Sequence, residues 1–312
     1  MTESEPTHGP RFLIADSQGA RQEQQDAGIC LHDDALGTAL LVVGDGVGGK
    51  SGGRIASQKV KALASELWEE RKGHLANPAE DLAALCRNAH EQINSDGEKL
   101  GLTPRTTIVA LYVTATRADW VHSGDSRLYH FRSGQLLERT EDHTFLEMMV
   151  QRGAVKEEDM GSHPDQNTLL QSLGGEEYSP PSTGTAGVTP NDAFLLCTDG
   201  FWERTKPEEM VELAFSARGQ ASELLAQAVE RAVGRNGPKG DNVTVALALP
   251  AREKSAAAAA RKRNLRLLIA AAVLVLAAVA FLFWPDGHKQ SDLVPPLKAP
   301  AAASPPAEPA PR

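Results

Sequence analysis

The sequence LLVVGDGVGGKSGG, residues 40–53, joins an apolar run to one carboxylate surrounded by glycines. The apolar half predicts a buried strand, which would place Asp45 where the chain leaves a sheet. The glycines would let the backbone come close to whatever Asp45 holds. The stretch fits three kinds of site: a phosphate-binding loop, a dinucleotide-binding loop, or a metal site with Asp45 as a ligand.

The first two alternatives depend on glycine spacing. Residues 44–51 match the G-x-x-x-x-G-K-[ST] loop of nucleotide hydrolases, and residues 44–49 match the dinucleotide fingerprint G-x-G-x-x-G. A carboxylate within a ring of N–H groups built for phosphate would repel the ligand. The dinucleotide loop needs an acidic residue that closes a second strand roughly 20 residues later, where a helical pattern runs instead. The stretch alone does not decide between the three.

Composition limits the class of protein. The chain has 312 residues, enough for one large domain or two small ones, and 41% of them are apolar. The net charge of −9 argues against nucleic acid as the main partner. Cys30, Cys86 and Cys197 lie far apart in the sequence, which favours a reducing compartment without structural zinc. Residues 1–10 are polar and acidic, and we expect a short disordered lead there rather than a signal peptide.

Hydrophobic periodicity predicts amphipathic helices and short strands that alternate with tight turns. The turns indicate antiparallel pairing. Residues 155–178 carry no strong pattern and predict a flap over a site. His122 and His130 flank strands and are interpreted as packing or surface residues. Helices are expected at 54–71, 77–99, 145–152 and 221–233, and strands at 11–15, 27–31, 40–43, 106–114, 118–123, 128–132, 136–140, 193–198 and 243–249.

Three aspartates stand at strand ends. Asp45 and Asp199 follow apolar strands, and Asp241 precedes one. If the last strand runs antiparallel to the others, the three carboxylates meet at one sheet edge. Such a group would repel itself unless cations lie between its members, and oxygen ligands favour Mg²⁺ or Mn²⁺. Two such ions can hydrolyse a phosphate ester, and the fork of Arg21 matches phosphate oxygens.

An ordered set of motifs then resembles the bacterial metal-dependent serine/threonine protein phosphatases of the type 2C family. Single motifs of this kind are weak, but seven in order are specific, and the similarity covers residues 12–249. The motifs are Arg21 with Asp26, Gly44-Asp45-Gly46 with Gly49, Thr106-Thr107, Gly124-Asp125-Ser126-Arg127, Asp142-His143, Thr198-Asp199-Gly200 and Gly240-Asp241-Asn242.

The resemblance implies a fold and a metal site. The fold is α+β: an antiparallel β-sandwich flanked by helices, in the order α-β-β-α. By analogy, Asp45 would bridge two Mn²⁺ or Mg²⁺ ions, with the carbonyl of Gly46 on one of them. Asp199 and Asp241 would complete the coordination of the other ion. Asp125, together with Asp199, matches a weaker third metal site.

The resemblance also assigns catalytic roles and exposes departures from the family pattern. Arg21 would hold the substrate phosphate, and Asp26 would orient metal-bound water for direct attack on phosphorus. The position before Asp26, often a glutamate ligand in the family, is Gln25 here. Gln24 replaces the usual asparagine, and Val47 stands where some members carry a histidine that serves as general acid. We still expect an active enzyme, because every central aspartate is present.

The C-terminal part differs in composition from the rest. Residues 251–266 form a basic linker, and residues 267–284 are an unbroken apolar run. Eighteen residues would span roughly 27 Å as a helix, close to the hydrocarbon core of a bilayer, so one transmembrane helix is expected. The basic cluster before it predicts a catalytic domain, residues 11–250, on the cytoplasmic side of the inner or cytoplasmic membrane. Residues 285–312, rich in proline and alanine, predict a disordered tail outside.

These observations predict a membrane-anchored phosphatase with a monomeric catalytic domain. Its substrates would be phosphoserine and phosphothreonine proteins, including a bacterial kinase and the targets of that kinase. The alternative is a membrane-tethered phospho-binding or scaffold protein without turnover, which the change to Gln25 leaves open.

Overall fold

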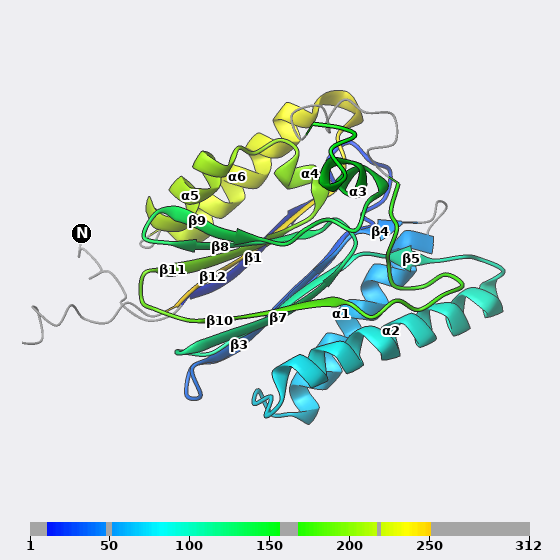
Figure 1. Cartoon of the computed structure of the whole chain (residues 1–312), viewed down its shortest axis with the longest axis horizontal. Coiled ribbons are helices and arrows are strands. Elements are labelled where there is room, and N and C mark those ends of the chain that lie inside the picture. The colour runs from blue at the N-terminus through cyan, green and yellow to red at the C-terminus, as the bar shows by residue number, and fades with distance from the viewer. Residues whose placement is uncertain (1–10, 48–51, 157–167, 217–219, 251–312) are drawn as a thin grey trace, which may run out of the picture. The chain divides into compact units, whose positions relative to one another are not determined.

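The computed structural model describes residues 11–47, 52–156, 168–216 and 220–250. They form two five-stranded antiparallel sheets that stack face to face, with helices on both outer sides (Figure 1). The first sheet has the order β1 (Arg11–Ser17), β12 (Val243–Leu249), β11 (Asp192–Cys197), β8 (Arg127–Arg132) and β9 (Gln135–Arg139). The second has the order β10 (Ser182–Gly187), β7 (Arg117–Ser123), β6 (Ile108–Val113), β3 (Thr38–Gly44) and β2 (Ala27–Asp33).

Helices cover the outer face of each sheet. Helices α1 (Gly52–Glu70) and α2 (Pro78–Leu100) pack on the second sheet, and α5 (Pro207–Ser216) and α6 (Ala221–Asn236) pack on the first (Figure 1). The α-β-β-α architecture expected from the resemblance is therefore present. Smaller elements are β4 (Gly46–Val47), β5 (Arg105–Thr106), α3 (Phe145–Gln151), α4 (Asp199–Trp202) and a 3₁₀ turn (Gly237–Lys239).

The apolar run of β3, residues 39–43, is continuous because both faces of the strand are buried. Leu40 and Val42 point to the helix-covered side, whereas Leu41 and Val43 point into the interior of the sandwich. Successive side chains of a strand alternate between faces, so a strand between two apolar layers needs hydrophobic residues at every position. The strand thus anchors two cores at once and fixes where Asp45 emerges.

The elements predicted from periodicity are present with small shifts in their ends. Helix α2 begins at Pro78 after Asn77, as predicted, and ends at Gly101, which adopts φ 64°. The sequence analysis did not predict β10, because its residues STGTAG carry no apolar alternation. It also made no prediction for α5. The predicted flap at 155–178 lies partly outside the described residues.

Several predictions fall entirely outside the part of the chain that the structure describes. They are the disordered lead at 1–10, the basic linker at 251–266, the transmembrane helix at 267–284 and the tail at 285–312. Among the described helices, none combines the length and the apolar character needed to cross a bilayer.

Strand β10 offers a test of its register. Gly184 lies opposite Trp120 of β7, and a Cβ at Gly184 would come within 2.2 Å of the buried indole ring. Gly184→Ala should therefore lower the free energy of unfolding by about 1–3 kcal/mol. Gly187→Ala, on the same strand with no atom within 4 Å of the added Cβ, should stay within about 0.5 kcal/mol of the parent. Denaturant unfolding measures both, and equal losses would contradict the register.

Candidate metal centre

Five aspartates lie together at one end of the sandwich. Asp45 follows β3 and Asp26 precedes β2, whereas Asp199 follows β11 and Asp241 lies just before β12. Asp125 lies in the turn between β7 and β8. The pKa of Asp45 is raised well above its ordinary value by burial and by repulsion from the other four carboxylates. The structure therefore brings together all the aspartates that the sequence analysis selected.

One geometric expectation was wrong. The sequence analysis placed Asp45, Asp199 and Asp241 on a single sheet edge. Strand β12 does run antiparallel to β11, as expected, but β3 belongs to the other sheet. The carboxylates therefore meet across the gap between two sheets, because each sheet sends its strand ends to the same end of the sandwich.

Two threonines hold the main chain of Asp45. The Asp45 N–H donates to Thr107 Oγ1 at 2.8 Å, and Thr106 Oγ1 donates to the Asp45 carbonyl at 2.9 Å. Thr107 Oγ1 also lies 2.6 Å from Ser126 Oγ, next to Asp125. The Thr107 hydroxyl therefore links two turns that each carry an aspartate. Thr106-Thr107 was recognised as a motif of the sequence, but its role follows only from these contacts.

Gly46 is a glycine because three backbone segments meet there. Its N–H donates to the Gln25 carbonyl at 3.1 Å. A Cβ at this position would lie 2.2 Å from the Gly53 carbonyl oxygen and 2.6 Å from that of Gln25. The contact of Gln25 with the Gly46 loop is therefore made by its main-chain carbonyl.

Asp26 is buried, and a threonine holds its carboxylate. Thr198 Oγ1 donates to Asp26 Oδ2 at 2.8 Å and itself accepts from the Thr244 N–H at 3.0 Å. Burial, together with repulsion from Asp241, raises the pKa of Asp26 to about 7, although the Thr198 hydrogen bond acts in the opposite direction. In the absence of cations, this carboxylate is therefore far easier to protonate than an exposed aspartate.

Asp199 has an oxygen that no described group satisfies. Its Oδ1 atom is buried and accepts no hydrogen bond from the described residues. Burial, followed by repulsion from Asp241 and Asp26, raises the pKa of Asp199 to about 7. A buried carboxylate oxygen without a donor, among other carboxylates, is suited to a hard cation.

The Arg21 side chain contacts the aspartate cluster at Asp241. The two side chains form an ion pair of 2.5 Å, and both are partly exposed. The pKa of Arg21 is raised by its hydrogen bond to Asp241 and by the charges of Asp199 and Asp45. The guanidinium therefore lies within the field of the carboxylates, at the solvent side of the cluster.

Asn242 supports the loop that carries Arg21. Its amide donates to the Gln18 carbonyl at 2.8 Å and to the Glu23 carbonyl at 3.1 Å. Its side-chain oxygen accepts from the Gln25 N–H at 2.8 Å. The supporting role inferred from the sequence therefore agrees with the contacts of this side chain.

The turn that carries Asp125 is braced by residues that the sequence analysis did not assign to the site. Trp202 Nε1 donates to the Asp125 carbonyl at 3.0 Å. The Arg127 guanidinium lies 3.4 Å over the Trp202 ring and forms two hydrogen bonds with Asp142, of 2.8 and 2.6 Å. Asp142 was part of a recognised motif, but its pairing with Arg127 across 15 residues had no local signal.

Within the described residues, no three acidic, histidine or cysteine side chains are already arranged around a common point as metal ligands. Asp241 is paired with Arg21 instead. The donor set nevertheless fits Mg²⁺ or Mn²⁺, because it consists of carboxylate and carbonyl oxygens and includes the unsatisfied Oδ1 of Asp199.

The chain is similar in sequence to bacterial phosphatases. It is 32% identical over 216 residues to the serine/threonine protein phosphatase PstP of Mycobacterium tuberculosis, a match that covers 68% of this chain and 40% of that protein. This chain therefore matches less than half the length of PstP. It is also 30% identical over 214 residues to the serine/threonine phosphatase stp of Listeria monocytogenes, covering 67% of this chain and 83% of that protein.

Solved structures agree with the sequence comparison. The crystal structure of the Mycobacterium tuberculosis serine/threonine phosphatase PstP/Ppp matches with a TM-score of 0.68 at 29% identity, covering 77% of this chain and 98% of that one. The catalytic domain of PstP in complex with two manganese ions matches with a TM-score of 0.66 at 28% identity, covering 77% and 97%. The Protein phosphatase 2C family matches residues 18–231, and the chain belongs to that family.

Proposed function

We propose that this chain is a metal-dependent protein phosphatase that hydrolyses phosphoserine and phosphothreonine with two Mn²⁺ or Mg²⁺ ions. The observation that carries the proposal is the group of five aspartates, which includes the unsatisfied Oδ1 of Asp199 and lies beside the Arg21 guanidinium. Such a group needs cations at neutral pH, and the two manganese ions of the PstP catalytic domain support this assignment.

Five residues would hold the ions: Asp45, the Gly46 carbonyl, Asp199, Asp241 and, for a weaker third ion, Asp125. Bound ions supply Lewis acidity, which activates water and compensates the charge of a phosphate ester. The hydrogen bonds to the main chain of Asp45 fix where its carboxylate projects. A site built on such fixed elements holds its donors before the ligand arrives.

Arg21 would bind the phosphate oxygens of the substrate. In the structure its guanidinium pairs with Asp241, and binding of cations to Asp241 would free it for phosphate. Asp26, held by Thr198, would orient the attacking water. Val47, 39% exposed, carries no acid or base, so the leaving alkoxide would take its proton from water or another group.

The partners and location of the protein are also proposals. Substrates would be phosphorylated proteins, and a serine/threonine kinase with its targets would be among them, by analogy with the family. Membrane attachment through residues 267–284 is supported by their apolar sequence and by the basic residues before them.

Asp45→Asn and Asp199→Asn should each lower phosphate release from a phosphothreonine peptide by on the order of 100-fold or more, because each change removes a charged ligand. The assay uses the full-length protein with Mn²⁺, and chelator should abolish the parent rate. Asp34→Asn is the control: its side chain is 82% exposed in the turn after β2, and its rate should equal that of the parent. A folded parent that binds the peptide but releases no phosphate with Mn²⁺ or Mg²⁺ would support the scaffold alternative, with Gln25 as its cause.

A reporter enzyme that works only outside the cytoplasm, fused after residue 312, tests the topology. The basic cluster at 261–266 predicts activity of this fusion and inactivity of the same reporter fused before residue 1. The reverse pattern would overturn the orientation, and inactivity of both fusions would overturn the single span.

A further inference from the structure

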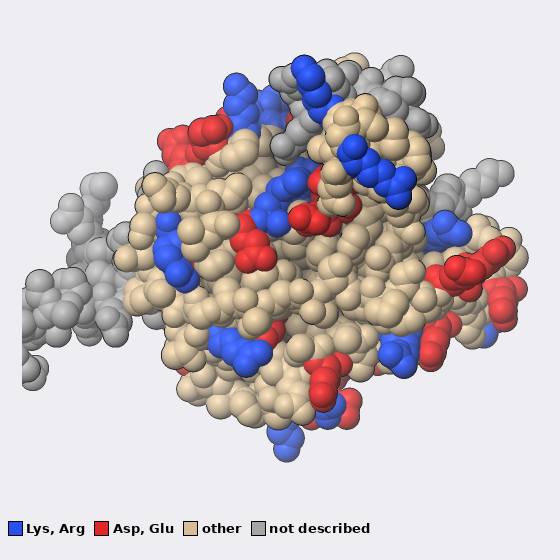
Figure 2. Space-filling view, in the orientation of Figure 1, with Lys and Arg blue, Asp and Glu red and all other residues tan. Residues whose placement is uncertain are grey.

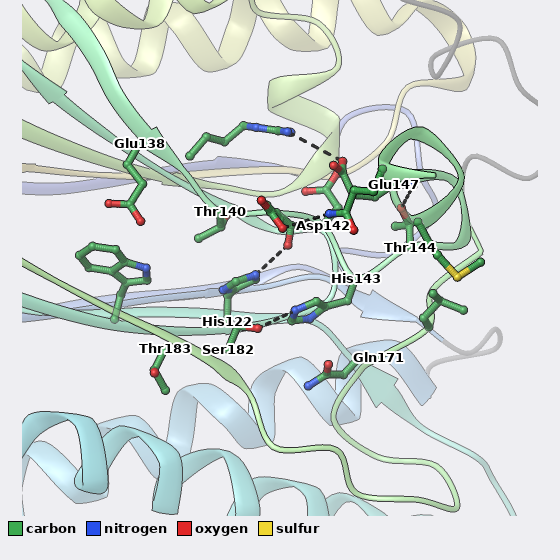
Figure 3. A pocket seen from close by; sticks show the side chains of 16 residues that line it. His122, Glu138, Thr140, Asp142, His143, Thr144, Glu147, Gln171, Ser182 and Thr183 are labelled. Carbon is green, nitrogen blue, oxygen red and sulfur yellow. Dashed lines mark hydrogen bonds and ion pairs between the residues drawn. The ribbon is translucent and has the colours of Figure 1, made fainter. Parts of the chain in front are cut away.

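A pocket of about 640 Å³ opens at the free edge of the sandwich, between β9 of one sheet and β7 and β10 of the other (Figure 3). Helix α3 closes it on one side. None of the five aspartates of the metal centre lines this edge pocket. Its volume lies within the usual range for ligand sites, about 300–1,000 Å³, and exceeds what one side chain needs.

The edge pocket is lined by more acidic than basic side chains. Four carboxylates line it, from Glu138, Glu141, Asp142 and Glu147, whereas Arg139 is the only lysine or arginine among the lining residues. Arg127 pairs with Asp142, and Arg139 lies 3.8 Å from Glu147 in a long ion pair. The Glu141 carboxylate accepts a hydrogen bond from the Gln151 amide at 3.0 Å. Figure 2 shows acidic and basic side chains side by side near the middle of the face that carries α3.

Two histidines of the pocket wall stay uncharged at neutral pH. The rings of His122 and His143 stack with centroids 4.5 Å apart. Burial lowers the pKa of both, and the neighbouring His122 helps to lower that of His143 to about 4. They therefore add no positive charge to the pocket, and Arg139 remains the only basic side chain among the lining residues.

Two buried acceptors of the pocket have no donor among the described residues. Glu147 Oε2 accepts no hydrogen bond although its side chain is only 9% exposed, and the nearest guanidinium nitrogen, of Arg139, is 3.8 Å away. His122 Nε2 lies 2.8 Å from the Glu141 carbonyl, which can only accept, so Nε2 carries the hydrogen and Nδ1 is a bare acceptor. That Nδ1 atom is buried and unpaired. Unsatisfied acceptors beside excess carboxylates call for a cation rich in N–H donors.

The pocket wall is joined to the metal centre. The His143 N–H donates to the Gly124 carbonyl at 3.0 Å, and its ring Nδ1 accepts from the Gly124 N–H at 3.2 Å. Gly124 directly precedes Asp125. The pocket wall and the Asp125 turn are therefore in direct contact, and we expect a polypeptide with its phosphorylated residue at the aspartates to place neighbouring residues near the edge pocket.

We propose that the edge pocket binds an arginine side chain of the phosphorylated substrate, together with the residues next to it. The inference rests on the proposed phosphatase function and adds a substrate preference to it. A guanidinium offers five donors and no acceptor, and its planar fork pairs with carboxylates better than the ammonium of lysine does.

The test uses the full-length protein with Mn²⁺ and a series of phosphothreonine peptides. Each peptide carries one arginine at a different distance from the phosphothreonine, and a matched peptide carries glutamine there. Arginine at one or two adjacent positions should raise kcat/KM by about three- to tenfold, the gain expected for a partly exposed, charge-assisted contact. p-Nitrophenyl phosphate, which cannot reach the pocket, reports the basal activity.

Variants locate the preference. Glu147→Gln should reduce the ratio of kcat/KM between the arginine and glutamine peptides to near one. Its hydrolysis of p-nitrophenyl phosphate should stay unchanged. Glu138→Gln, on the exposed strand β9, should reduce this ratio partly. Because the position is exposed, this variant still tests the pocket if Glu147→Gln fails to fold. Glu66→Gln on the exposed side of α1 is the control and should retain the full preference.

The outcomes separate the two proposals. No hydrolysis of p-nitrophenyl phosphate or of any peptide would overturn the phosphatase function itself. Hydrolysis of all peptides with equal kcat/KM, or an arginine preference that survives both Glu147→Gln and Glu138→Gln, would overturn the edge pocket as its source and leave the phosphatase function standing.

Discussion

The structure depends on one unfavourable interaction, the mutual repulsion of five aspartates at one end of a β-sandwich. Folding gathers and buries these carboxylates, and burial and repulsion together raise the pKa of Asp45, Asp125 and Asp199. The two sheets and their helix-covered cores supply the favourable free energy that holds the carboxylates in place. Cations bound among these carboxylates would offset their mutual repulsion at neutral pH.

Short hydrogen bonds position the cluster without neutralising it. Thr107, Thr198 and Asn242 each contact backbone or carboxylate groups from separate segments of the chain. Because hydroxyls and amides carry no charge, they fix the loops while leaving the carboxylates available for metal ions. A hydrogen bond also joins the metal centre to the edge pocket: the N–H of Gly124, the residue before Asp125, donates to the His143 ring.

Local patterns predicted much of the fold. Long amphipathic helices such as α1 and α2, and buried strands such as β3, follow from periodicity. Asp45, Asp199 and Asp241 were identified by their positions at strand ends, whereas Asp26 and Asp125 entered the site only through the family resemblance. The division of strands between two sheets did not follow, because β1 pairs with β12 across more than two hundred residues. Strand β10 was missed because its sequence STGTAG carries no apolar alternation. The edge pocket was also missed: His122 was interpreted as packing or surface, since its neighbours come from distant segments.

The most direct test of the metal centre is thermal unfolding of the full-length protein between pH 5 and 8, with and without Mn²⁺. Asp26 and Asp199 have a pKa of about 7 when folded against an ordinary 3.8, so the folded state binds more protons and metal-free stability should fall as pH rises towards 7. His122 and His143 have lowered pKa values, so their contribution makes the protein more stable as pH rises. The Asp199→Asn variant contains the same histidines, so the difference between parent and variant reports the aspartates alone. We expect a steeper fall in the parent than in Asp199→Asn, and Mn²⁺ should raise the parent's Tm more at pH 8 than at pH 5. Equal pH profiles of parent and variant, with no shift on adding Mn²⁺, would contradict this expectation.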